Sequence, residues 1–226
     1  MLAGRYRLAE PLGCGWEGEV YRVAELRTGI SRAAKVFYPE RNPGNRTARF
    51  HARKLERLRH CPILIQYHHS EEVEVGERKA TCLISDLVEG EPLTELTERH
   101  AGRRLPTFEA LHLLRALAVG VECIHQTGEY HGDLHAGNIV VRRRGVHFDL
   151  RVLDFFHRGR ISRENRQMDI VDMVRIFYDA VGGPERYASQ PPEVKTICRG
   201  LRVGLILERF PTAERLRRHL ESFGWQ

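Results

Sequence analysis

Residues 131–138 read His-Gly-Asp-Leu-His-Ala-Gly-Asn and gather several polar side chains directly after a long amphipathic stretch. A metal site would use His131, Asp133 and His135, whereas a helix cap would use Asp133 alone. Zinc requires a well-spaced third or fourth ligand, and the nearby histidines stand at no recognisable spacing. A cap leaves Asn138 unexplained, so neither function accounts for the whole cluster.

Phosphoryl transfer accounts for the aspartate and the asparagine together. In that chemistry Asp133 orients and deprotonates an acceptor hydroxyl, and Asn138 binds Mg²⁺ from the same loop. A second acidic metal ligand is then required at the end of a nearby strand, and Asp154 follows an apolar strand at that place. A histidine side chain ordinarily titrates near neutrality, so in this chemistry His135 could offer the γ-phosphate a proton or a partial charge. The alternative is a hydrogen-bonding loop residue.

The segment LGCGWEGEV, residues 12–20, has the pattern GxGxxGxV. Its glycines, Gly13, Gly15 and Gly18, allow a tight turn and let backbone N–H groups approach phosphate oxygens. A dinucleotide-binding turn lies between a strand and a helix, but this segment lies between two strand-like segments. The pattern therefore favours a flap that covers phosphates.

Lys35 lies in an apolar strand-like segment, AAKVF, where an unpaired ammonium group would be costly. Only four of the 36 basic residues are lysines, so this one departs from the chain's preference for arginine. An edge-strand lysine facing water is the alternative. Its position one strand after the glycine-rich segment favours a contact with nucleotide phosphates.

The hydrophobic pattern changes from a strand-like to a helical period at Glu89-Gly90. The expected N-terminal elements are strands at Tyr6–Leu12, Glu19–Leu26, Ser31–Tyr38, 63–75 and 79–86 and a helix at 46–59 with Phe50, Leu55 and Leu58 as its apolar stripe. The expected C-terminal elements are a helix capped by Thr107 and buried through Leu114, Leu117, Val121 and Ile124, a hairpin of Ile139–Val141 and Phe148–Leu153, and helices at 168–181 and 212–223.

The motifs GxGxxGxV, AxK, HxDxxxxN and DF, in this order, resemble the eukaryotic-like protein kinase superfamily from about Tyr6 to Phe223. The resemblance implies an α+β, bilobal fold in which a small antiparallel β-sheet with one helix precedes a mainly helical lobe. The N-lobe would span about 1–87, the hinge about 86–92 and the C-lobe about 93–226.

The resemblance also implies ATP and Mg²⁺ as cofactors and gives each motif a role. Lys35 would bind the α- and β-phosphates, Asp133 would be the catalytic base, and Asp169 would brace the catalytic loop. Asn138 and Asp154 would be the metal ligands. Ser85 would stand at the gatekeeper position. The nucleotide would contact the flap, Lys35 and the hinge. The flap and hinge residues in contact with it would be Leu12, Gly13, Gly15, Gly18, Val20, Asp86, Leu87 and Val88.

Several positions depart from the family's pattern. His51 replaces the helix glutamate that pairs with the strand lysine, and Glu56 lies about 140° away around the helix. Phe156 replaces the glycine after the metal-binding aspartate, and Gly132 replaces the arginine before the catalytic aspartate. These losses leave a nucleotide-binding pseudokinase scaffold as one alternative function.

The acceptor implied by the family is a serine or threonine hydroxyl of a protein. The form HGDLHxGN also resembles aminoglycoside and choline phosphotransferases, and the short segment after 181 leaves little room for a peptide platform. A small-molecule hydroxyl is therefore the alternative acceptor.

Composition limits the partners and the compartment. The 30 acidic residues are interspersed among the 36 basic ones, so the charge of +6 does not indicate nucleic acid. The longest apolar run, Ala116–Val121, is too short to span a membrane, and no signal peptide is recognisable, so we expect a cytoplasmic chain. The five cysteines include no CxxC pair, so we expect reduced, mostly buried thiols.

Overall fold

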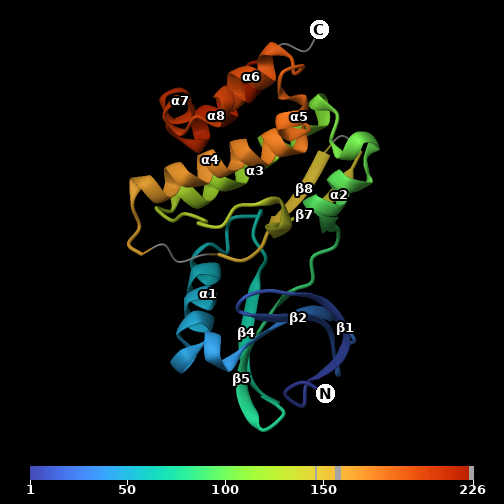
Figure 1. Cartoon of the computed structure of the whole chain (residues 1–226). Coiled ribbons are helices and arrows are strands. Elements are labelled where there is room, and N and C mark those ends of the chain that lie inside the picture. Colours follow the sequence, from blue (N-terminus) through green and yellow to red (C-terminus); the bar gives the residue numbers. More distant parts are fainter. Residues whose placement is uncertain (146, 156–158, 224–226) are drawn as a thin grey trace. The chain divides into compact units, whose positions relative to one another are not determined.

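The computed structural model describes residues 1–145, 147–155 and 159–223. The chain divides into two compact units (Figure 1). The N-terminal unit comprises Met1–His60 and Leu64–Val88, and the C-terminal unit comprises Cys61–Ile63 and the chain from Glu89 onward. Each unit has its own hydrophobic core and is described by itself.

The N-terminal unit is built on an antiparallel sheet with the strand order β1-β2-β3-β5-β4. Its strands are β1 (Tyr6–Cys14), β2 (Gly18–Glu25), β3 (Ser31–Phe37), β4 (Tyr67–Val75) and β5 (Arg78–Asp86). β4 begins later than the predicted residue 63, because Ile63 belongs to the C-terminal unit. There its carbonyl accepts a hydrogen bond of 2.8 Å from the amide of Val152.

The two faces of this sheet have different roles. One face carries the unit's main core, formed by Leu2, Tyr6, Val23, Ala34, Val73, Ala80, Cys82 and Ile84. On the other face Phe37 and Leu83 pack against Ala48 of α1 (Arg46–Arg57). Because side chains alternate along a strand, Lys35 shares this second face with Phe37.

Helix α1 buries polar side chains that its sequence pattern did not predict. Leu55 and Leu58 are buried as expected, but Phe50 is only half-buried. His51 and Lys54, each 4% exposed, lie on the buried side of the helix instead. The sheet side of α1 is therefore partly polar, which allows it to take part in a charged site.

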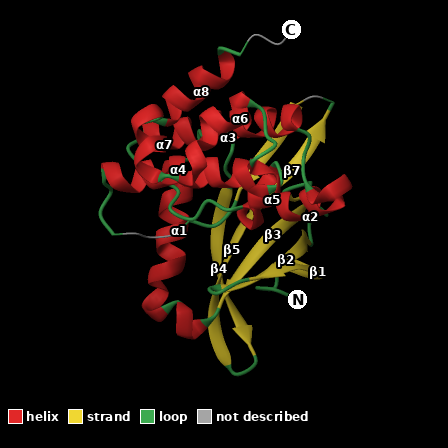
Figure 2. Cartoon of the chain, turned by 45° about the horizontal axis from the view of Figure 1, so that its top comes forward, coloured by secondary structure: helices red, strands yellow, loops and turns green. Residues whose placement is uncertain are grey.

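The C-terminal unit is mainly helical (Figure 2). Its helices are α2 (Leu93–Arg99), α3 (Thr107–Gln126), α4 (Arg163–Ala180), α5 (Gly183–Tyr187), α6 (Pro192–Cys198), α7 (Val203–Arg209) and α8 (Ala213–Glu221). The predicted seam of α3 is confirmed, because its Leu114, Leu117, Val121 and Ile124 are at most 1% exposed. Thr107 is not its cap: Pro106 holds the cap position and Thr107 is the first helical residue.

A small antiparallel sheet accompanies these helices. It comprises β6 (Glu91–Pro92), β7 (Ile139–Arg144) and β8 (His147–Val152), so the predicted hairpin is confirmed. Helix α4 starts before the predicted residue 168, because the Ser162 hydroxyl accepts a hydrogen bond of 3.2 Å from the amide of Asn165 and caps the helix. Among the described helices, none is both long and apolar enough to cross a membrane.

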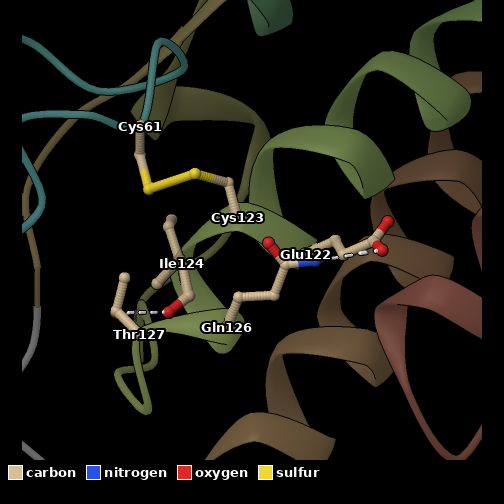
Figure 3. The surroundings of a disulfide bond; sticks show 6 residues. All are labelled: Cys61, Glu122, Cys123, Ile124, Gln126 and Thr127. Carbon is tan, nitrogen blue, oxygen red and sulfur yellow. Dashed lines mark hydrogen bonds between the residues drawn. A yellow bond between two sulfur atoms is a disulfide. The ribbon is translucent and has the colours of Figure 1, made fainter.

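The cysteine prediction was partly wrong. Cys61 and Cys123 form a disulfide with a Cα–Cα distance of 5.8 Å (Figure 3). It ties the short segment before Ile63 to α3, where a Cβ on Gly120 would lie only 2.1 Å from Ile63. The pairing spans 62 positions and follows no sequence motif, so only the tertiary fold reveals it. Cys82 and Cys198 are buried free thiols as expected, and Cys14 is exposed.

Candidate active site

The glycine-rich turn joins β1 to β2 in the N-terminal unit, and Gly15 donates a hydrogen bond of 2.9 Å to the carbonyl of Gly18. A Cβ on Gly18 would lie 2.1 Å from the Val36 carbonyl oxygen, so strand packing requires glycine there. A Cβ on Gly13 or Gly15 would meet no described atom within 4 Å. Packing therefore does not explain these two glycines, and their backbone is accessible to a ligand such as a phosphate.

The strand register places the predicted nucleotide residues of the sheet on one face. Val20 pairs with Lys35, and Ala33 pairs with Ser85. Cross-strand partners share a face and alternate residues return to it, so these four side chains lie on the face that α1 covers in part. Leu12 is on β1 and is exposed.

The predicted hinge residues follow directly from β5. The amide of Asp86 donates to the Gln66 carbonyl at 3.0 Å. Its carboxylate lies 2.9 Å from the Arg32 guanidinium and 2.7 Å from His68 Nε2. Leu87 and Val88 continue from this point with half-buried side chains. The start of the hinge is therefore anchored to two neighbouring strand segments.

Lys35 has an acidic partner that the sequence pattern did not predict. Its Nζ lies 3.0 Å from Oε2 of Glu17, which stands in the glycine-rich turn. The same oxygen lies 2.8 Å from Nε2 of the buried His51. Glu56 instead pairs with Arg59 on the exposed side of α1, at 3.2 Å. The carboxylate beside Lys35 therefore comes from the turn, and α1 contributes a histidine that contacts it.

The charge of Glu17 is stabilised by these neighbours. Burial alone would raise the pKa of Glu17, but contacts with His51 and Lys35 lower it to about 2. Hydrogen bonding and opposite charges both favour the ionised carboxylate. Glu17 is consequently an anion at neutral pH.

The catalytic loop of the C-terminal unit is held by one buried carboxylate. Asp169 of α4 is fully buried and accepts hydrogen bonds from the amides of His131 and Gly132, at 2.7 and 2.8 Å. Its Oδ2 also lies 2.9 Å from Nε2 of His125 on α3. The predicted bracing role of Asp169 is confirmed, whereas His125 was not predicted. In the sequence, the position of His125 in the last turn of the helix before the loop could have indicated this contact.

The pKa of Asp169 follows from these contacts. Burial alone would raise it, but the hydrogen bond of His125, the nearby histidines and the His131 amide lower the pKa below its ordinary value. The carboxylate is therefore the stable form inside the unit. An ionised acceptor strengthens the hydrogen bonds from both loop amides.

The backbone of the loop explains Gly132. Its φ is 89°, a conformation that residues with a Cβ rarely adopt, so glycine at this position removes strain. The adjacent His131 ring directs Nε2 to the Leu153 carbonyl at 3.0 Å, which ties the loop to the segment after β8. His131 thus has a structural role.

Asp133, His135 and Asn138 form a small network. The Asn138 side-chain amide donates to the carbonyl and to Oδ2 of Asp133, at 3.0 and 3.1 Å. His135 accepts a hydrogen bond at Nδ1 from Gly137, and its Nε2 lies 3.8 Å from Asp133 Oδ2. Accepting at Nδ1 places the proton of a neutral His135 on Nε2, which faces Asp133. Both side chains are about half-exposed and accessible to a substrate.

Two candidate metal ligands are adjacent in this unit. The amide of Leu153 donates to the Asn138 carbonyl at 2.8 Å, and Asp154 is the next residue. Asp154 has a φ of 42°, an uncommon value for a residue with a side chain. Since the Asn138 nitrogen is engaged by Asp133, its Oδ1 is the atom that suits a cation. An amide oxygen and a carboxylate are the hard ligands that Mg²⁺ prefers, so these residues fit the ion.

The predicted site residues thus form two groups. The flap, Lys35 and the start of the hinge are in the N-terminal unit; Asp133, His135, Asn138 and Asp154 are in the C-terminal unit. Phe156, which stands where the family has a glycine after Asp154, lies outside the described residues.

Comparisons with known proteins identify the family of this chain. Residues 6–190 match the protein kinase domain family. The serine/threonine-protein kinase pkn2 of Myxococcus xanthus is 33% identical over 159 residues, covering 69% of this chain and 18% of that protein. The serine/threonine-protein kinase PknA of Mycobacterium tuberculosis is 30% identical over 157 residues, covering 68% and 35%.

A plant relative and a solved structure extend the comparison. A putative cyclin-dependent kinase F-2 of Oryza sativa is 32% identical over 154 residues, covering 67% of this chain and 46% of that protein. This chain spans under half the length of each of these three relatives. The PknI kinase domain of Mycobacterium tuberculosis, solved as a double mutant, has a TM-score of 0.69 at 20% identity and covers 98% of this chain and 95% of its own. The predicted kinase-like α+β fold is confirmed.

Proposed function

Because the chain belongs to the protein kinase domain family, we propose that it transfers the γ-phosphoryl group of Mg·ATP to a serine or threonine hydroxyl of a protein. The observation that carries this proposal is the network of Asp133 and Asn138 beside Asp154, on a loop held by the buried Asp169. A carboxylate for the acceptor hydroxyl and oxygen ligands for a cation are the groups that phosphoryl transfer requires.

Each group has a defined task in this proposal. Gly13 and Gly15 bring the flap backbone to the phosphates, Val20 packs against the base, and Lys35 binds the α- and β-phosphates. The hinge backbone at Asp86, Leu87 and Val88 takes the adenine. Asn138 and Asp154 would hold Mg²⁺, which would neutralise negative charge on the phosphates.

The acceptor chemistry centres on Asp133. Its carboxylate accepts a hydrogen bond from the Asn138 amide, which orients it, and it is exposed enough to meet a hydroxyl. We propose that it orients that hydroxyl and takes its proton. The Nε2 proton of His135 is available to an oxygen of the transferring phosphate. Positioning and charge neutralisation supply most of the acceleration, so the metal ligands should matter at least as much as the base.

A small-molecule hydroxyl is the second candidate acceptor. In the described chain, the segment between α4 and α6 holds only the short helix α5, Gly183–Tyr187, which offers little surface for docking a peptide. A compact alcohol would need no such platform. The pseudokinase scaffold is favoured by His51, since the residue that pairs with Lys35 in the family is absent from α1.

Labelled ATP distinguishes these functions. Wild type and Asp133→Asn are incubated with γ-labelled ATP and Mg²⁺, either alone, with generic protein substrates or with a panel of metabolite alcohols. We expect label on protein hydroxyls, with a rate about 10²–10⁴-fold lower for Asp133→Asn and unchanged ATP binding. Label only on metabolites would identify a small-molecule kinase. Nucleotide binding without transfer would identify a scaffold, and an equally active Asp133→Asn would refute the role of Asp133.

A further inference from the structure

Glu17 occupies a position that the kinase family does not assign to the lysine's partner. In this chain α1 presents His51 instead of a carboxylate toward the sheet, and the Glu17 carboxylate lies within 3.0 Å of both Lys35 Nζ and His51 Nε2. We propose that Glu17 is the positioning residue for Lys35, replacing the helix glutamate from the glycine-rich turn. This inference rests on the proposed function, because Lys35 needs positioning only if it binds phosphates.

The backbone around Glu17 is fixed by several contacts. Its carbonyl accepts a hydrogen bond of 2.9 Å from the amide of Tyr38, directly after β3. On one side, the guanidinium carbon of Arg41 lies over the ring of Trp16, 3.3 Å from the ring centroid. On the other side, Gly18 is packed against the Val36 carbonyl, where no side chain fits. The turn is therefore held to β3, and the Glu17 carboxylate is directed toward Lys35 by the fold.

His51 completes the arrangement from the helix. It is 4% exposed and lies between the aromatic rings of Phe37 and Phe50, with centroid distances of 5.7 and 5.5 Å. These contacts restrict the imidazole, so its Nε2 holds a defined position beside Glu17. Helix α1 thus acts on Lys35 indirectly, because its His51 ring contacts the turn carboxylate that lies beside the lysine.

The charges suit a phosphate-binding lysine. An ammonium group has three donors, so a phosphate-binding lysine can contact a carboxylate and phosphate oxygens at the same time. The Lys35 side chain is only 15% exposed, and in such surroundings a fixed carboxylate orients the ammonium more strongly than it would in water. Because Glu17 stands inside the flap, the flap and the lysine are coupled: a shift of the turn moves the group that orients Lys35.

A matched pair of variants tests this role. Glu17→Gln removes the charge beside Lys35 with little change in shape. Glu19→Gln makes the same change two residues later, where the carboxylate accepts hydrogen bonds from Tyr21 and Tyr38 instead. Mg·ATP affinity is measured by calorimetry, and kcat and KM for ATP are measured in the labelled-ATP assay. We expect kcat/KM to fall about 10²-fold for Glu17→Gln, as for a misplaced positioning group, and to stay near wild type for Glu19→Gln.

A relocation variant separates positioning from folding. Adding His51→Glu to Glu17→Gln restores a carboxylate on α1, and Glu17→Asp keeps the charge in the turn. Recovery of Mg·ATP affinity in either variant supports positioning, because a purely structural defect would not follow the charge. Failure of both to recover, in a Glu17→Gln protein that has lost affinity, would overturn the proposal and leave Glu17 a role in the turn's folding only.

Other results are equally decisive. Glu17→Gln with wild-type affinity and kinetics would overturn the inference while leaving the proposed function intact. A wild-type protein that neither binds Mg·ATP nor transfers phosphate would instead refute the proposed function itself.

Discussion

Lys35 and the catalytic loop are held in place by different kinds of contact. In the C-terminal unit, two backbone amides of the loop bind the fully buried Asp169. In the N-terminal unit, Lys35 is held by the partly exposed Glu17, which a helix histidine supports. Backbone contacts do not depend on which side chains the loop carries, and at Gly132 the backbone conformation itself favours glycine. A side-chain charge can be supplied from another segment of the chain, and this is the role that we propose for Glu17.

The largest expected effect is the loss of turnover in Asp154→Ala. This change removes one of the two candidate oxygen ligands for Mg²⁺, and charge neutralisation has no substitute in phosphoryl transfer. Labelled-ATP turnover at increasing Mg²⁺ concentration measures it. Asp149→Ala is the control, because that β8 carboxylate pairs with Arg151. Substantial turnover by Asp154→Ala would show that the C-terminal group of residues does not bind the metal.

The next effect is on stability. Asp169→Ala should lower the free energy of unfolding by about 2–5 kcal/mol, because two buried amides and His125 lose their acceptor. Urea denaturation measures it. Asp179→Asn on the same helix is the control, since burial raises the pKa of Asp179 by more than the nearby Arg175 lowers it. If the two changes lowered the free energy of unfolding equally, the contacts of Asp169 with the loop would contribute no special stability.

Acid should weaken the contact between Glu17 and Lys35 in the N-terminal unit. The pKa of Glu17 is lowered from 4.5 to about 2, so its contribution is complete above the unfolded value and is lost as pH falls toward 2. For a half-buried group this amounts to about 1–2 kcal/mol after allowance for solvent screening. The difference in unfolding free energy between wild type and Glu17→Gln should therefore narrow from pH 6 to pH 3. A difference that stays constant would show that the Glu17 charge does not stabilise the turn.

The smallest expected effect comes from chemical labelling of the cysteines, which leaves the fold intact. Exposed Cys14, which lies in the flap, should react with iodoacetamide in the native protein. Cys82 and Cys198 should not react, because burial raises their pKa values to about 12 and little of the reactive thiolate forms. Cys61 and Cys123 should react only after reduction and unfolding. Mass spectrometry reports each site, and native labelling of Cys61 or Cys123 would contradict their pairing.

Local signals predicted most of the elements. Alternating and helical periods placed the strands, the α3 seam and the hairpin, because burial of one face imposes those periods on the sequence. The errors lie at ends and caps: Thr107 begins α3 without capping it, and Ser162 starts α4 earlier than apolar spacing indicated. Such positions depend on single hydrogen bonds, which hydrophobic patterns do not encode.

By itself, the sequence determined the order of the motifs, the fold class and the residue types at the candidate site, because short spacings and periodic burial are local properties. Only the tertiary structure decided which carboxylate faces Lys35, which histidine supports Asp169, and that Cys61 meets Cys123. These contacts join residues 18, 44 and 62 positions apart. No local pattern specifies such a pair, because the distance between its members is set by how whole elements pack.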